Sequence, residues 1–158
     1  MRLELLAAGH QDAILEFETA NRDYFPTTVP DRGDYFFADY PARHAELLAY
    51  QDAGTDRLHV LTTDDGTIAG RVNLICIADG EAELGYRIGQ EFAGRGLATE
   101  AVRQVCELAR AEYGLTRLRA RTTDDNAPSV AVLLRNGFVV TGATTLSGGP
   151  GHHYRRDL

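Results

Sequence analysis

The chain has 158 residues, and its 16 basic side chains are all arginine, set against 23 acidic ones, which leaves a net charge of −7. The absence of lysine excludes a P-loop phosphate site and Schiff-base catalysis, because both require a lysine amine. The negative charge argues against nucleic-acid and membrane-surface partners, and the length predicts a single domain over residues 1–158.

The two cysteines predict neither a disulfide nor a zinc site. Cys76 and Cys106 stand in apolar surroundings, without CxxC or Cys/His spacing. The first residues lack the long apolar segment of a signal peptide, and no run of 18 apolar residues could span a membrane. We therefore expect a reducing, cytoplasmic setting and no bound metal.

The first third of the chain alternates apolar runs with an irregular aromatic stretch. Residues 2–6 have the pattern of a short strand, and the apolar residues of 13–21 follow the spacing of one helix face. Residues 22–38 combine several aromatic side chains with Pro, Asp and Gly, which predicts a loop folded over an apolar surface. A second helix is expected over residues 42–52.

The middle of the chain predicts a three-stranded antiparallel meander. Its strands are expected over residues 58–63, 68–78 and 81–88. Asp65-Gly66 and Asp79-Gly80 separate these runs, and Asp-Gly between β-branched runs is a strong hairpin signal.

The last third returns to helical spacing and then ends in strands. An apolar stripe runs along a helix that begins near residue 96. A strand is then expected over residues 118–122, a helix over 128–135, and strands over 138–146 and 153–158. The predicted order β-α-α-β-β-β-α-β-α-β-β corresponds to an α+β fold, with a mixed, mostly antiparallel sheet of six or seven strands and helices on both faces.

A glycine-containing loop joins the strand at residues 81–88 to the helix that follows it. Gly94 and Gly96 allow the backbone to approach a ligand closely, and the free N–H groups of the first helical turn point toward one spot. This arrangement suits a pyrophosphate, although a tight turn without a ligand would explain the same residues. A dinucleotide-binding fingerprint is excluded, because Thr99 stands at its third glycine and the preceding strand belongs to a meander.

Two motifs in this half of the chain resemble those of the GNAT superfamily of N-acetyltransferases. The family's cofactor loop follows R/Q-x-x-G-x-G/A, which residues 93–98 match except at Ala93. The family's next helix carries N-x-x-[SA]-x-x-x-Y-x-x-x-G-F, which residues 126–138 match except that Leu133 replaces the tyrosine. GRGLATEAV followed by NAPSVAVLLRNGF is most similar to the Rim-type branch, which acetylates the N-termini of ribosomal proteins.

The resemblance implies acetyl-CoA as co-substrate. We expect the strand that ends at Ile88 to diverge from its neighbour and to pair with the pantetheine arm like an added strand. The resemblance also implies that the backbone N–H of Ile88 polarises the thioester carbonyl. The expected cofactor-binding residues are Tyr86, Arg87, Ile88, Gly94, Arg95, Gly96, Leu97, Ala98, Thr99 and Asn126.

Two of these assignments have a simpler alternative. Arg95 would contact a phosphate, or it would be a solvated loop arginine. Asn126 resembles the family's cofactor-contacting asparagine, and it also fits the N-cap of the next helix, so that both roles can hold.

Acetyl transfer requires a neutral amine, a polarised carbonyl and a proton for the departing thiolate. Glu83 is the expected general base, acting directly or through water; the alternative is an exposed strand carboxylate without a catalytic role. Ser129, at the start of the second motif's helix, is the expected proton donor to sulfur. Leu133 stands where many members of the family have a tyrosine, so that the proton donor here would be a serine, which is a weaker acid than tyrosine.

The expected reaction is direct attack of an amine on acetyl-CoA. A protein or peptide α-amine, with a pKa of about 7.7–8.0, is partly neutral at pH 7 and therefore asks little of a base. Such an N-terminus, ribosomal or other, is the favoured acceptor, and a polyamine, amino acid or aminoglycoside is the alternative acceptor. A different function, a non-catalytic acyl-CoA-binding sensor, is the other hypothesis. Tyr24, Phe25 and Tyr154 are candidates to border the acceptor, and exposed strand edges would allow a homodimer.

Overall fold

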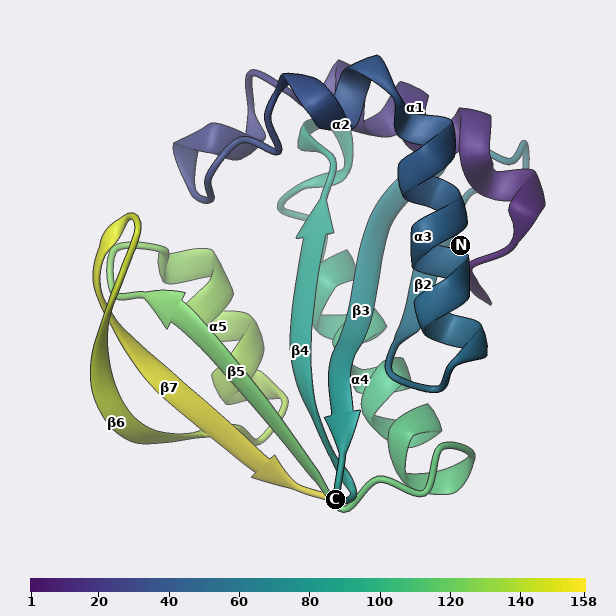
Figure 1. Cartoon of the computed structure of the whole chain (residues 1–158). Helices are drawn as coiled ribbons and strands as arrows, with labels where there is room; N and C mark the ends of the chain where they lie inside the picture. Colours follow the sequence, from purple (N-terminus) through teal and green to yellow (C-terminus); the bar gives the residue numbers. More distant parts are fainter.

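The computed structural model describes residues 1–158 as one seven-stranded sheet with helices on both of its faces (Figure 1). The strand order is β1-β2-β3-β4-β5-β7-β6, and every neighbouring pair is antiparallel except β4 and β5. The strands are β1 (Arg2–Leu5), β2 (Arg57–Thr62), β3 (Ile68–Ala78), β4 (Glu81–Ile88), β5 (Arg117–Thr123), β6 (Val139–Leu146) and β7 (Gly149–Asp157). The helices are α1 (Gln11–Ala20), α2 (Asp34–Ala38), α3 (Tyr40–Asp52), α4 (Leu97–Ala111) and α5 (Ala127–Arg135), with short 3-10 turns at Ala8–His10, Phe25–Thr27 and Gln90–Phe92.

The predicted α+β architecture is confirmed, with one helix more than the predicted order contained. The loop expected over residues 22–38 holds α2, so the observed order has three helices between β1 and β2. Gly33, at φ 88°, turns the chain into this helix, and the Phe36 ring packs 5.0 Å from that of Tyr40. The helix has five residues, too few to be stable alone, so tertiary packing rather than local propensity forms it.

The last hairpin has a shorter turn and a longer second strand than expected. Strand β7 begins at Gly149, four residues before the predicted start, because Leu146 of β6 already pairs with Gly149. Glycine and proline are disfavoured in strands, and here the pairing with β6 overrides that preference. None of the helices has the length and apolar character needed to cross a membrane.

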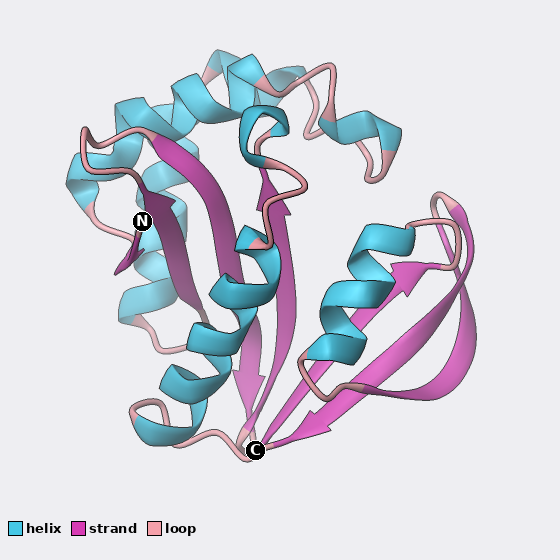
Figure 2. Cartoon of the chain, turned by 180° about the vertical axis from the view of Figure 1, so that it is seen from behind, coloured by secondary structure: helices cyan, strands magenta, loops and turns pink.

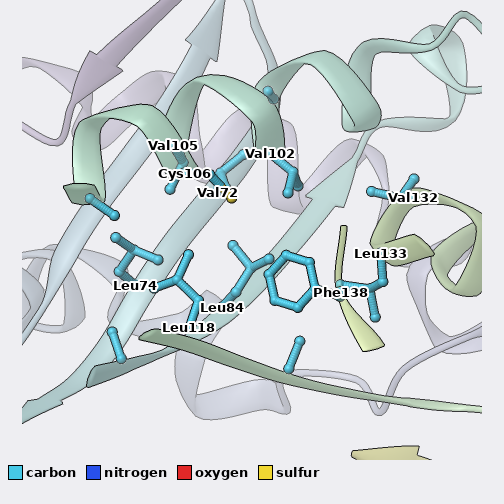
Figure 3. Packing of buried hydrophobic residues seen from close by; sticks show 14 of the residues in the cluster. Val72, Leu74, Leu84, Val102, Val105, Cys106, Leu118, Val132, Leu133 and Phe138 are labelled. Carbon is cyan, nitrogen blue, oxygen red and sulfur yellow. The ribbon is translucent and has the colours of Figure 1, made fainter. Parts of the chain in front are cut away.

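Two apolar clusters lie on opposite faces of the sheet. The larger one joins α4 and α5 to the strands, and Figure 3 shows its centre, where Leu133 lies against Phe138. The smaller one joins α1 and α3 to the other face through residues such as Ile14 and Val60. Seen from behind in Figure 2, α4 and α5 cover the face opposite to α1 and α3.

The strands β4 and β5 meet only at one end. Their parallel pairing covers Glu81–Glu83 with Arg117–Arg119, after which the two strands diverge (Figure 1). The remainder of β4, from Leu84 to Ile88, therefore has a strand neighbour only on the β3 side. This open edge is the expected splay, and it positions the site described below.

Candidate active site

A cavity of about 580 Å³ occupies the space where β4 and β5 diverge. Its walls come from β3 at Arg71 and Asn73, the second half of β4, the end of β5, the loop before α4 with the start of that helix, α5, and the segment of residues 24–32. The cavity thus reaches both faces of the sheet.

Backbone N–H groups of β4 point into this gap. Gly89 donates its N–H to Ala69 on the β3 side, and successive residues of a strand direct their N–H groups to opposite sides. The N–H groups of Ile88 and Tyr86 consequently face the open edge. An extended ligand with amide groups can pair with this edge as an added strand.

The loop before α4 forms a backbone nest for an anion. Gly94 and Gly96 have φ values of 74° and 76°, and no atom lies within 4 Å of the position that a Cβ would take at either residue. Both glycines line the cavity, together with Leu97–Thr99, whose N–H groups are the free ones of the first helical turn. The loop therefore fits the diphosphate of a nucleotide-type ligand.

A side chain at Gly94 is expected to weaken CoA binding tenfold or more. In Gly94→Val the β-branched residue is strained at positive φ and places methyl groups in the open space of the nest. Gly66→Val is the matched control, because Gly66 has φ 87°, equal open space and a position outside this cavity. Calorimetric titration with CoA should distinguish the two; similar affinity in both variants would contradict the nest.

Two arginines near the glycine loop and α5 differ in their relation to the cavity. Arg95 does not line the cavity, and its guanidinium lies 6.0 Å from the centre of the Phe92 ring. Arg135, at the exposed end of α5, does line it. A single arginine at a helix end carries no local signature, so Arg135 could not be singled out from sequence.

Asn126 forms the expected N-cap and also lies in the wall of the cavity. Its side-chain oxygen accepts a hydrogen bond from the Ser129 N–H at 3.4 Å, which makes it the N-cap of α5. The residue also lines the cavity. The cap fixes the first turn of α5 and thereby the position of Ser129.

Ser129 faces a tyrosine that the sequence had assigned only a backbone role. The Tyr86 hydroxyl lies 2.9 Å from the Ser129 Oγ and 3.2 Å from the Ser129 carbonyl oxygen. Burial raises the pKa of Tyr86 to about 12, so its hydroxyl stays protonated at neutral pH. Leu133, at the position of the family's tyrosine, is buried in the core, and Tyr86 brings a phenol to the same cavity from the opposite wall.

Glu83 lies beside the cavity rather than in its wall. Its Oε1 accepts a hydrogen bond from the Nε of Arg121 at 2.9 Å, and Arg121 is the member of this pair that lines the cavity. Along β4, Glu83 shares a face with Gly85 and Arg87, because alternate residues of a strand point the same way. Glu83 therefore contacts a residue of the cavity wall without being part of that wall itself.

The α1 side of the cavity holds a cluster of charges that sequence reasoning missed. Glu18 is 1% exposed, and its carboxylate lies 3.0 Å from Arg32, 3.0 Å from Arg71 and 3.3 Å from Arg87. Burial by itself would raise the pKa of Glu18, but the three guanidinium groups outweigh it and hold that pKa below its usual value. The three arginines line the cavity, and Glu18 does not.

Open space at Gly85 of β4 lies beside this cluster of charges. Gly85 pairs with Asn73 across β3 and β4, and no atom lies within 4 Å of the position that a Gly85 Cβ would take. The Asn73 Oδ1 is buried without a hydrogen-bond partner. Tyr24 and Phe25 line the cavity as expected, whereas Tyr154 is buried in the core outside its wall.

The chain matches known proteins along most of its length. Residues 2–139 match a family model described as an acetyltransferase (GNAT) domain. Among curated proteins, the chain is 29% identical over 131 residues to a probable N-acetyltransferase of Bacillus subtilis, covering 78% of this chain and 72% of the relative.

Solved structures share the fold at lower identity. A ribosomal-protein-S5-alanine acetyltransferase from Vibrio fischeri superposes with a TM-score of 0.91 at 20% identity, covering 98% of this chain and 91% of that one. A spermidine N-acetyltransferase from Vibrio cholerae superposes with a TM-score of 0.81 at 16% identity, covering 99% and 94%.

Proposed function

This chain belongs to the GNAT family of acetyltransferases, and we propose that it transfers the acetyl group of acetyl-CoA to an α-amino group by direct attack within a ternary complex. One observation carries this proposal: the cavity has a backbone-lined wall on the α4 side and an open, charged wall on the α1 side, and the two meet at Gly85. The first wall suits the donor, and the second suits an acceptor.

The residues of the donor wall fit CoA. Gly94 and Gly96 leave the space that a diphosphate would fill, and the free edge at Tyr86 and Ile88 offers partners for the pantetheine amides. Acetyl-CoA supplies an activated thioester when it is bound. The Ile88 N–H would then donate to the carbonyl oxygen and stabilise the negative charge that develops on it.

The acceptor is activated on the other side. A neutral amine nitrogen attacks the carbonyl carbon, so that an N–C bond forms and the C–S bond breaks. Glu83 accepts the proton lost by nitrogen through a bridging water. Ser129, hydrogen-bonded to the protonated Tyr86, donates its proton to the leaving sulfur, which departs as the thiol. Solvent then returns a proton to Ser129 and takes up the one held by Glu83, so that the net change is one proton moved from nitrogen to sulfur.

A covalent acetyl-enzyme is not needed for this route. Cys76 is exposed and Cys106 is buried, and neither lines the cavity. The Cys76→Ala/Cys106→Ala double variant should therefore turn over at close to the wild-type rate.

An α-amine is the acceptor that this site serves best, and a peptide or protein N-terminus is its favoured source. With a pKa of about 7.7–8.0, such an amine is already partly neutral at pH 7, whereas a lysine amine near 10.4 is not. A base that works through water is adequate for the former. Release of CoA thiol, measured over peptides, amino acids and polyamines, tests the proposal; binding of acetyl-CoA without release for any amine would instead favour a sensor.

Removal of the Ser129 hydroxyl is expected to lower kcat by about 10²-fold. In Ser129→Ala the sulfur loses its nearest donor, while the Asn126 cap on the residue's backbone N–H remains. KM for acetyl-CoA should stay within a few-fold. Tyr86→Phe is the companion variant: a comparable loss of kcat would make the two hydroxyls one unit, and a wild-type rate in both would remove them from the chemistry.

A further inference from the structure

We propose that the acceptor carries a carboxylate close to its amine, and that Arg32, Arg71 and Arg87 bind this carboxylate. The inference rests on the proposed acetyl transfer and names the substrate class for it. Free α-amino acids and peptides with an acidic side chain near the N-terminus share this chemistry.

The charge of the cavity is opposite to that of the protein. Five arginines and no aspartate or glutamate line it, although the chain has a net charge of −7. The five are Arg32, Arg71, Arg87, Arg121 and Arg135. Arg121 is paired with Glu83, and Arg135 lies at the end of α5, beside the donor wall.

The side chains of the other three arginines lie on the side of the cavity where Glu18 is buried. Arg71 and Arg87 are directly opposite each other on β3 and β4, and they alternate with Val72 and Tyr86, which pack toward α4. They therefore point to the α1 face of the sheet, away from the glycine loop. A cationic group on that face acts on the molecule that enters there.

The cluster has more positive charge than its own members can balance. Three guanidinium groups share the single carboxylate of Glu18. Burial, followed by repulsion from Arg32, lowers the pKa of Arg87 to about 10 and also lowers that of Arg71. A second carboxylate would relieve this repulsion.

Unused hydrogen-bonding atoms point to the same ligand. Arg71 is 3% exposed and lines the cavity, and its Nε has no partner; the buried Nε of Arg32 has none either. A buried donor without a partner is costly, and a carboxylate accepts from guanidinium groups with matching geometry. The unpartnered Asn73 Oδ1 lies on the same wall and can accept from the amine of the ligand.

The guanidinium groups are held in place before a ligand arrives. Arg87 lies over the Phe25 ring at 4.5 Å from its centre, and Arg32 lies over Phe36 at 5.0 Å. Such contacts restrict the long side chains, so that less conformational freedom is lost on binding.

The positive charge of the arginine cluster disfavours binding of polyamines and favours the neutral, reactive form of a bound amine. Positive charge near an ammonium group disfavours its charged form and lowers its pKa, which raises the neutral fraction of a bound acceptor. A molecule with several ammonium groups and no anionic group meets only this repulsion.

Matched acceptors test the proposal directly. Thiol release is measured for L-amino acids against their amides, for tetrapeptides with Asp against Asn at the second position, and for spermidine. We expect kcat/KM to be tenfold or more higher for one of the two carboxylate-bearing series. Preference within the amino-acid pair or within the peptide pair identifies the source of the carboxylate.

Arg32→Gln should remove this preference, with KM for the acceptor rising tenfold or more and KM for acetyl-CoA unchanged. Arg22→Gln is the matched control, because Arg22 lies in the same segment and pairs with Asp31 and Asp34 outside the cavity. The proposal is overturned if neither pair shows a preference for the carboxylate, or if spermidine is turned over as fast as the preferred carboxylate-bearing acceptor.

A binding measurement separates this inference from the proposed reaction. In the presence of CoA, N-acetyl amino acids and acetylated Asp peptides are titrated against their amide and Asn counterparts. Preferential binding of the carboxylates, lost in Arg32→Gln, supports the site even if no amine is turned over, in which case the acetyl transfer alone fails. Absence of preference overturns the carboxylate site whether or not turnover occurs.

Discussion

Replacing Glu18 with glutamine is expected to lower the free energy of unfolding by about 3–5 kcal/mol. Glu18 is the only acidic partner of Arg71 in the structure, and both side chains are almost fully buried. An amide of the same size leaves three guanidinium groups facing a neutral group. A domain of this length would lose about 10 °C or more in Tm, measurable by calorimetry and by urea unfolding followed by circular dichroism.

The ion pair of Glu18 and Arg71 also predicts how the free energy of unfolding depends on pH. The folded-state pKa of Glu18 lies below its ordinary value of 4.5, so its contribution is complete above that value and is lost as the pH falls through the lower, folded pKa. The wild type should therefore lose its advantage over Glu18→Gln only in acid. At pH 7 the difference between the two should be at its full size.

The control for this experiment lies on the same helix. Glu16 is exposed on α1, and Glu16→Gln should change the free energy of unfolding by no more than about 0.5 kcal/mol. If Glu18→Gln proved equally mild, the cluster would be solvated in solution, and the carboxylate site proposed beside it would lose its basis.

The glycine loop and the cap of α5 could be predicted from sequence because their geometry is local. Gly94 and Gly96 lie within one short loop, and their positive φ values and the helix that follows come from residues next to them. Asn126 and Ser129 form a cap within a single turn. Such features need no knowledge of which distant segments meet.

The acceptor wall could not be predicted in the same way. Glu18 and Arg71 are 53 residues apart, and Arg87 lies farther along the chain. One signal existed: Glu18 follows Ile14 by four residues, on the buried face of α1, and a carboxylate on such a face requires a buried partner. Which cation that partner would be depended on the pairing of β3 with β4.

Replacing Glu83 with glutamine is expected to lower kcat by about 10²- to 10⁴-fold, the usual range for a general base. The change removes the proton acceptor and keeps the size of the side chain and its contact with Arg121. KM for acetyl-CoA should stay within a few-fold, because no part of the donor wall is altered. The measurement is thiol release at saturating concentrations of both substrates, from pH 6 to pH 9.

Glu81 provides a matched control on the same strand and the same face. It also pairs with an arginine, since its Oε1 lies 3.0 Å from Arg117, but it stands at the closed end of the gap, where β4 still pairs with β5. Glu81→Gln should retain kcat within about threefold. Equal rates for the two variants would show that the Glu83 carboxylate only pairs with Arg121.

Because Arg121, and not Glu83, lines the cavity, a third variant, Arg121→Gln, separates the roles of the two residues. Its pair with Arg121 must leave one carboxylate oxygen free for water, since the guanidinium contacts only Oε1. Arg121→Gln should therefore slow the reaction much less than Glu83→Gln, because the base remains. If instead Arg121→Gln caused the larger loss, the guanidinium in the cavity would be the catalytic member of the pair, and the base would have to be sought among groups that reach the cavity directly.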